Sequence, residues 1–134
     1  MYRVKLPRAV AEEIIAHARA EAPNECCGVL AGDGESVTRL FRATNTAHSP
    51  VKFAFDPKEM LAVDEEATRA GLGILGFYHS HTFIEAYPSV TDVKQASWPE
   101  YAYLIVSLAD EGSPVIRAFH LEGGQITEAA LEVG

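Results

Sequence analysis

Two histidines and an aspartate between residues 79 and 92 have the types and spacing of metal ligands. His79 and His81 follow an apolar run at residues 74–78, which predicts a buried strand. Residues two apart on a strand point to the same face, so both imidazoles are expected to project together at its end. Asp92 falls in the first turn of a predicted helix. Two neutral imidazoles and a carboxylate form a ligand set for Zn²⁺, and catalytic zinc keeps a further position open for water.

The same residues also have a structural explanation. Ser89 and Asp92 have the spacing of a capping box, in which the serine caps the helix and the helix dipole favours the aspartate. We expect that a carboxylate directed at a metal does not also reach fully back to the cap. Short histidine motifs often arise without a metal. The combination of two histidines, a loop, a serine and a third ligand is what favours a metal site.

A zinc hydrolase also needs a base and a group that stabilises the developing oxyanion. Glu25 directly precedes the apolar run 26–31 and is the best-placed base, with an exposed loop acid as the alternative. The Ser89 hydroxyl can donate to an oxyanion. Cys26 and Cys27 are weaker candidates for a nucleophile, because both fall in the predicted core. His17, on the first predicted helix, is expected to face solvent.

Composition limits the protein class. The chain has 134 residues, 48% of them hydrophobic and 22% charged, which predicts one globular domain spanning residues 1–134. No apolar run approaches the roughly 20 residues of a membrane span. The net charge of −8 and the scattered basic residues argue against nucleic acid or an anionic membrane as a partner. The adjacent cysteines do not suit a disulfide framework and no secretion signal is evident, so a cytoplasmic location is expected.

Hydrophobic periodicity and turn residues predict a mixed β-sheet flanked by helices, an α/β arrangement. Asp56 and Pro57 are typical of a helix start, and Gly71 of a helix end. The predicted helices cover residues 8–21, 57–70 and 89 to about 98. The predicted strands cover residues 2–6, 26–31, 36–43, 51–55, 73–79, 101–108, 115–120 and 125–128.

The block 24–32, which contains Glu25, together with His79-x-His81, Ser89 and Asp92, resembles the motif of the JAMM (MPN+) metalloproteases. The resemblance covers nearly the whole chain and implies the cytidine-deaminase-like α/β fold of JAMM/MPN domains. It also implies Zn²⁺ on the two histidines and the aspartate, Glu25 as general acid and base, and Ser89 as the oxyanion donor.

Thr82 departs from the proline that many members of this family carry after the second histidine. With Thr82 and the run 85–89, the chain is similar to a bacterial branch, the Mec-type peptidases of cysteine biosynthesis. That likeness implies a ubiquitin-like sulfur-carrier protein with a C-terminal Gly-Gly as substrate, cleaved after its last glycine to release cysteine. The tail is expected to lie beside residues 51–55 by β-augmentation. Thr82, Glu85 and Tyr87 are expected to contact the substrate.

Two other functions stay open. An isopeptidase that removes ubiquitin-like carriers from protein lysines would use the same catalytic residues. A metal-free MPN scaffold would only bind partners, but such scaffolds generally lack the ligands that this chain retains. A zinc nucleobase deaminase is disfavoured, because it needs a Pro-Cys-x-x-Cys block that the sequence does not contain. Whether the chain forms a homodimer is also open.

Overall fold

The computed structural model describes residues 2–134. The elements, in chain order, are β1 (Arg3–Leu6), α1 (Arg8–Glu21), β2 (Cys27–Asp33), β3 (Ser36–Ala43), α2 (Pro57–Arg69), β4 (Gly73–His81), α3 (Val90–Gln95), β5 (Ala102–Ser107), β6 (Val115–Glu122) and β7 (Gln125–Val133). Over these residues, no helix has the length and apolar character needed to cross a membrane.

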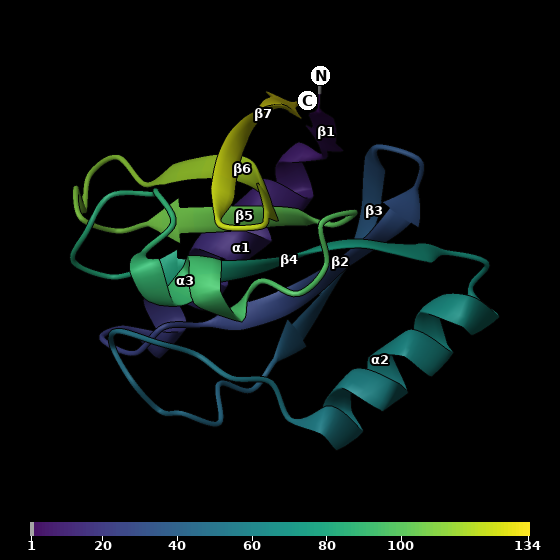
Figure 1. The fold of residues 1–134 in the computed structure, drawn as a ribbon, viewed down its shortest axis with the longest axis horizontal. Helices are drawn as coiled ribbons and strands as arrows, with labels where there is room; N and C mark the ends of the chain where they lie inside the picture. The colour runs from purple at the N-terminus through teal and green to yellow at the C-terminus, as the bar shows by residue number, and fades with distance from the viewer. Residues whose placement is uncertain (1) are drawn as a thin grey trace.

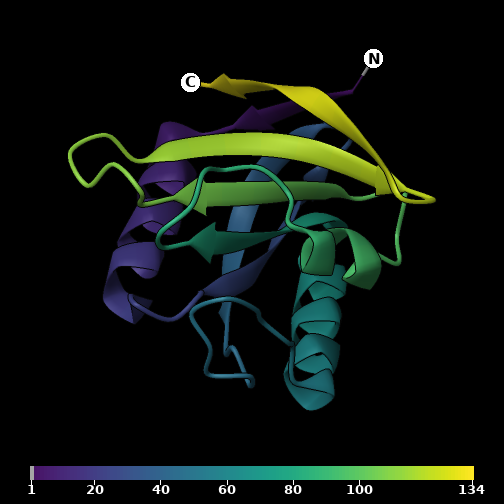
Figure 2. The ribbon, with the colours of Figure 1, turned by 60° about the vertical axis from the view of Figure 1, so that its left-hand side comes forward.

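The strands form a closed barrel in the order β1-β3-β2-β4-β5-β6-β7 (Figure 1). The short strand β1 closes it by pairing in parallel with both β3 and β7. The β4–β5 pair is also parallel, and the remaining pairs are antiparallel. The predicted mixed sheet with flanking helices is therefore confirmed. Because β1 and β7 are neighbours, the two chain ends lie on the same side of the molecule (Figure 2).

Helices cover the sheet from two sides. In Figure 1, α1 lies behind β4 and β5, and α3 lies in front of them. Ile14 and Ala18 of α1 pack in one core cluster with Tyr78. Val63 and Ala67 of α2 belong to a second cluster, together with strand residues whose side chains point the opposite way. The sheet therefore separates an α1 side from a side that carries α2 and α3.

Successive side chains along β4 point to opposite sides of the sheet. Phe77 belongs to the cluster on the α2 side, whereas Tyr78 belongs to the cluster on the α1 side. By the same period of two, His79 and His81 share the side of Phe77. Ser80 points the other way, and its Oγ accepts a hydrogen bond of 2.7 Å from the Cys26 N–H. The predicted joint projection of the two histidines is confirmed.

Strands β2, β4, β6 and β7 run two to five residues beyond their predicted ends, and two other predicted segments differ more. Residues 51–55 do not form a strand, because the Ala54 N–H and C=O bind Asn45 and Thr46 instead of a neighbouring strand. The last helix, α3, ends at Gln95 and not near residue 98. The predicted start of α2 is confirmed, since Asp56 accepts a 3.0 Å hydrogen bond from the N–H group of residue 58 and a proline follows it.

His17 is buried, so the expectation that it faces solvent was wrong. It lies one helical turn from Ile14, and the apolar stripe of α1 is broad enough to include it. Its Nδ1 lies 2.7 Å from the Tyr78 hydroxyl oxygen, which satisfies both polar groups in the core. A Cβ on Gly28 would lie 2.1 Å from the Tyr78 ring, so only glycine leaves room for this side chain.

We predict that Tyr78→Phe lowers the free energy of unfolding by about 1–3 kcal/mol, because it leaves the buried His17 nitrogen without its partner. Urea unfolding of the two proteins measures the difference. Tyr2→Phe, at an exposed tyrosine, is the control and should change little. Equal stability of Tyr78→Phe and the wild type would show that this hydrogen bond contributes nothing.

Candidate metal centre

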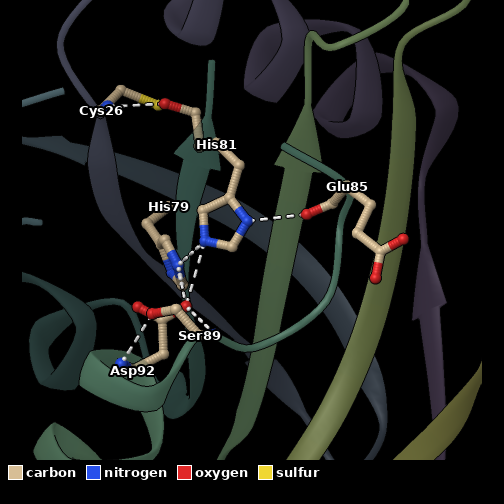
Figure 3. Close-up of polar contacts among 7 residues, drawn as sticks. Cys26, His79, His81, Glu85, Ser89 and Asp92 are labelled. Carbon is tan, nitrogen blue, oxygen red and sulfur yellow. Dashed lines mark hydrogen bonds and ion pairs between the residues drawn. The ribbon is translucent and has the colours of Figure 1, made fainter. Parts of the chain in front are cut away.

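Three donor atoms converge where β4 ends and α3 begins (Figure 3). His79 Nε2 lies 3.2 Å from His81 Nε2 and 3.1 Å from Asp92 Oδ2, and His81 Nε2 lies 3.0 Å from the same oxygen. Ligands of a tetrahedral zinc with bonds of about 2.0–2.1 Å are separated by about 3.3 Å. All three residues are buried. The donor set therefore fits a small divalent metal with one position left open.

The pKa shifts of Asp92 and His79 suit this ligand set. Burial raises the pKa of Asp92, but hydrogen bonds from His79 and His81 outweigh it and hold the pKa well below the usual range. Burial lowers the pKa of His79, which favours the neutral imidazole that binds metals. Burial also lowers the pKa of His81, but hydrogen bonds to Asp92 and to the Glu85 carbonyl leave it raised overall.

Neighbouring groups fix the orientation of both imidazoles. His81 Nδ1 lies 2.8 Å from the Glu85 carbonyl oxygen, an acceptor, so Nδ1 donates and Nε2 is left as the ligand atom (Figure 3). The Phe53 ring stacks on the ring of His79, with centroids 4.5 Å apart and an interplanar angle of 26°. Each ligand ring is therefore held by a loop packed beside β4.

Asp92 serves the helix cap and the donor cluster at once. The Ser89 N–H donates to Asp92 Oδ2 at 2.9 Å, and the Asp92 N–H donates to Ser89 Oγ at 3.0 Å, which completes the capping box. The same Oδ2 faces both imidazoles, so the expectation that the carboxylate could not do both was wrong. The reason is geometric: the first turn of α3 faces the end of β4. The Ser89 hydroxyl accepts in this box, and its own proton stays available for donation.

Glu25 is buried, in contrast to an ordinary loop acid. It precedes β2, its N–H donates to the Ser49 carbonyl at 2.9 Å, and only 3% of the residue is exposed. Its Oε1 is buried and has no hydrogen-bond partner among residues 2–134. Burial raises the pKa of Glu25 to about 8, and the charges of His81 and Asp92 also influence it. A buried carboxylate oxygen without a protein partner is suited to binding water beside the three donors.

An apolar cavity of about 190 Å³ opens beside the donor cluster. His79 and Asp92 form part of its wall, together with Phe53 and Trp98. A second cavity of about 460 Å³ extends towards α2 and shares with the first Phe55, Phe77 and Trp98. The two cavities are continuous along their shared residues and lead to the donor cluster. We call them together the apolar groove.

The other candidate residues fall into two groups. Thr82, Glu85 and Tyr87 lie on the loop between β4 and α3, and the Thr82 hydroxyl donates to the Pro23 carbonyl at 3.0 Å. Cys26 and Cys27 are free thiols in the core. Burial raises the pKa of Cys26 to about 11 and that of Cys27 to about 12, so neither side chain is suited to act as a nucleophile.

Sequence reasoning missed Asn45 as part of the site, and it placed Phe53 beside the substrate tail without its contact with His79. Asn45 is buried at 5% exposure in an irregular segment and donates to the Glu25 carbonyl at 3.0 Å. Phe53 was assigned to a strand, and the alternation there gave no sign that its ring covers His79. The available signal was a polar amide between a predicted strand and the start of α2, which by itself is typical of any loop.

Comparison with known proteins places the chain among peptidases. Residues 7–122 match the family described as prokaryotic homologs of the JAB domain. A CysO-cysteine peptidase of Mycobacterium tuberculosis is 38% identical over 122 residues, covering 90% of this chain and 84% of that protein. A desampylase of Haloferax volcanii is 42% identical over 112 residues, covering 78% and 81%. A probable TtuB-protein conjugate cleaving protease of Thermus thermophilus is 39% identical over 129 residues, covering 96% and 81%.

Solved structures agree with the fold. The solution structure of protein DSY2949 from Desulfitobacterium hafniense has a TM-score of 0.90 at 36% identity, covering 98% of this chain and 92% of that one. A structure described as a JAMM metalloprotease-like zinc site in the proteasome and signalosome has a TM-score of 0.63 at 21% identity, covering 98% and 97%. The family match covers most of the sequence and the donor cluster fits a metal. The chain therefore belongs to the prokaryotic JAB-domain family and is a metallopeptidase of the JAMM type.

Proposed function

We propose that the protein is a zinc-dependent hydrolase that cleaves the amide bond after the C-terminal glycine of a small ubiquitin-like sulfur-carrier protein and releases cysteine. The observation that carries this proposal is the buried Oε1 of Glu25, which has no hydrogen-bond partner within residues 2–134 and is influenced by the charges of His81 and Asp92. The names of the relatives support the substrate class. One is a CysO-cysteine peptidase, and another is a probable TtuB-protein conjugate cleaving protease.

Each residue of the site has a role in this reaction. Zn²⁺ held by the two histidines and Asp92 would polarise the substrate carbonyl and lower the pKa of water to about 7. The positive charge of a bound metal would favour the ionised form of Glu25, which then takes the proton of the attacking water at its Oε1 and returns it to the leaving amine. The Ser89 hydroxyl donates to the carbonyl oxygen as that oxygen gains negative charge. Burial keeps Glu25 and the three donor residues out of bulk water, where their interactions would be weaker.

The carrier tail is proposed to lie along residues 52–55. Asn45 binds the Lys52 carbonyl and the Ala54 N–H, but the Phe53 N–H and C=O have no hydrogen-bond partner within residues 2–134. That free edge suits pairing with an extended peptide. Phe53 packs over His79, which narrows the approach to the metal ligands and favours glycine there. Residues upstream of the two glycines would contact the apolar groove.

The leaving cysteine is proposed to meet the loop between β4 and α3. Thr82 is fixed to the carbonyl of Pro23, and the ring of Tyr87 packs edge-to-face on Phe119 with centroids 5.5 Å apart. The Glu85 side chain is exposed on the same loop. Two buried free thiols agree with a reducing cytoplasm as the place of action.

A second candidate function is removal of ubiquitin-like carriers from protein lysines. The similarity to the desampylase and to the conjugate-cleaving protease favours it. A metal-free scaffold is disfavoured, because the donor cluster is complete.

We predict that the wild type converts a carrier–cysteine adduct to free carrier faster than it cleaves a carrier–lysine isopeptide, as followed by mass spectrometry. EDTA should abolish both reactions. Glu25→Gln should keep its metal and slow cleavage by about 100-fold or more, because it removes the base. Glu21→Gln, at an exposed glutamate on α1, is the matched control.

Cleavage of the isopeptide alone would support the second candidate function instead. A metal-loaded Glu25→Gln protein with wild-type rates would refute the assignment of the base.

The raised pKa of Glu25 gives a test that is independent of activity. Its pKa rises from an ordinary value of 4.5 to about 8 in the folded chain, so its contribution to stability is present below about pH 4.5. As the pH rises towards 8, the unfolded chain loses this proton first and the contribution is lost. We predict that metal-free wild type loses stability relative to Glu25→Gln between about pH 5 and pH 8. Urea unfolding at several pH values measures this, and a constant difference across that range would contradict it.

A further inference from the structure

Asn45 is a buried polar residue whose hydrogen-bonding capacity is fully used. It follows β3 and begins the irregular segment that leads to α2. Its Nδ2 donates to the carbonyl oxygens of Glu25 and Lys52, at 3.0 Å each. Its Oδ1 accepts from the N–H groups of Ala47 at 3.0 Å and Ala54 at 3.1 Å. Two donors and two lone pairs are all that an amide side chain offers.

One side of this network holds the proposed base. The Glu25 carbonyl binds Asn45, and the Glu25 N–H binds the Ser49 carbonyl at 2.9 Å. Both backbone hydrogen bonds of Glu25 therefore go to the irregular segment. Neither goes to a barrel strand, because β2 begins only at Cys27. The position of the base depends on the conformation of this segment.

The other side of the network holds the wall of the apolar groove. Lys52 and Ala54, which Asn45 binds, flank Phe53. Asn45 therefore occupies the inner edge of this extended stretch, and the outer edge at Phe53 stays free. The Phe53 ring lies against His79, so a shift of this stretch would also disturb the packing around a metal ligand.

We propose that Asn45 is a positioning residue that holds the Glu25 backbone and the wall of the apolar groove in one fixed relation. This proposal rests on the proposed function, since the wall is taken to receive the carrier tail. Binding of the tail at Phe53 then places its scissile bond in register with Glu25. The four partners of Asn45 all lie outside the strands, so its role concerns the site and not the barrel.

Asn45→Asp tests the proposal. The variant keeps the size and the oxygen that Ala47 and Ala54 use, but it replaces the donor that faces Glu25 and Lys52 with an oxygen that cannot donate. On a carrier conjugate, kcat should fall by about tenfold to 100-fold, because small misplacements of a base are costly. KM should rise as well, and zinc per chain should stay unchanged.

The matched control is Thr46→Ala, which removes one 3.2 Å hydrogen bond to the Ala54 carbonyl in the same segment. Its kcat and KM should stay within about twofold of the wild type. If Asn45→Asp and Thr46→Ala have the same kinetics, the proposal is wrong.

Amide hydrogen exchange of the as-purified proteins gives a readout without substrate. In Asn45→Asp, the amides of Glu25 and Thr46 should exchange faster, while the amide of Ile105 in β5 keeps its protection. Loss of protection in β5 as well would mean that Asn45 supports the whole fold, which would overturn a positioning role. If the wild type fails to cleave any carrier conjugate, the proposed function fails, but the exchange result still decides whether Asn45 holds Glu25.

Discussion

The donor cluster depends on the place of one carboxylate oxygen, Asp92 Oδ2. It accepts a hydrogen bond from the Ser89 N–H and lies within 3.1 Å of both imidazole Nε2 atoms. Through this oxygen, the first turn of α3 is fixed to the end of β4. Removal of the carboxylate would take away both the acceptor of the helix cap and the partner of the two histidines. The same side chain therefore supports the site and the local fold.

Glu25 is the proposed base of the site, and its burial sets it apart from an ordinary loop acid. Burial of a carboxylate without a partner for one of its oxygens costs free energy. Native proteins keep such groups few, and they tend to occur where chemistry takes place. Here the free oxygen belongs to a residue whose backbone is held from both sides by the segment that also forms the wall of the apolar groove. The proposed base, the donor cluster and the apolar groove are therefore connected by one continuous set of contacts.

The sequence was most informative where a short-range period determines the geometry. The period of two along β4 predicted that His79 and His81 project together, and the N-cap signals predicted α2 and α3 at their correct starts. Barrel closure through β1 could not be predicted, because pairing of strands far apart in the chain leaves no local pattern.

The misassigned residues have a common cause. His17 was placed in solvent because its partner, Tyr78, lies 61 positions away. Residues 51–55 alternate like a strand, but they bind Asn45 and Thr46 instead of a neighbouring strand. Both errors concern hydrogen bonds to side chains, which hydrophobic periodicity does not reveal even where, as between Asn45 and Ala54, the partners are close in sequence.

The most direct test is the metal content of the protein purified without added metal, measured beside Asp92→Asn. The asparagine oxygen can still accept from the Ser89 N–H, so the helix cap is kept while the charged ligand is lost. Asp110→Asn, in an exposed turn, is the control. We expect about one zinc per chain in the wild type and the control, and far less in Asp92→Asn. A wild type without metal, or an Asp92→Asn protein with the full zinc content, would contradict the assignment of this site as the metal centre.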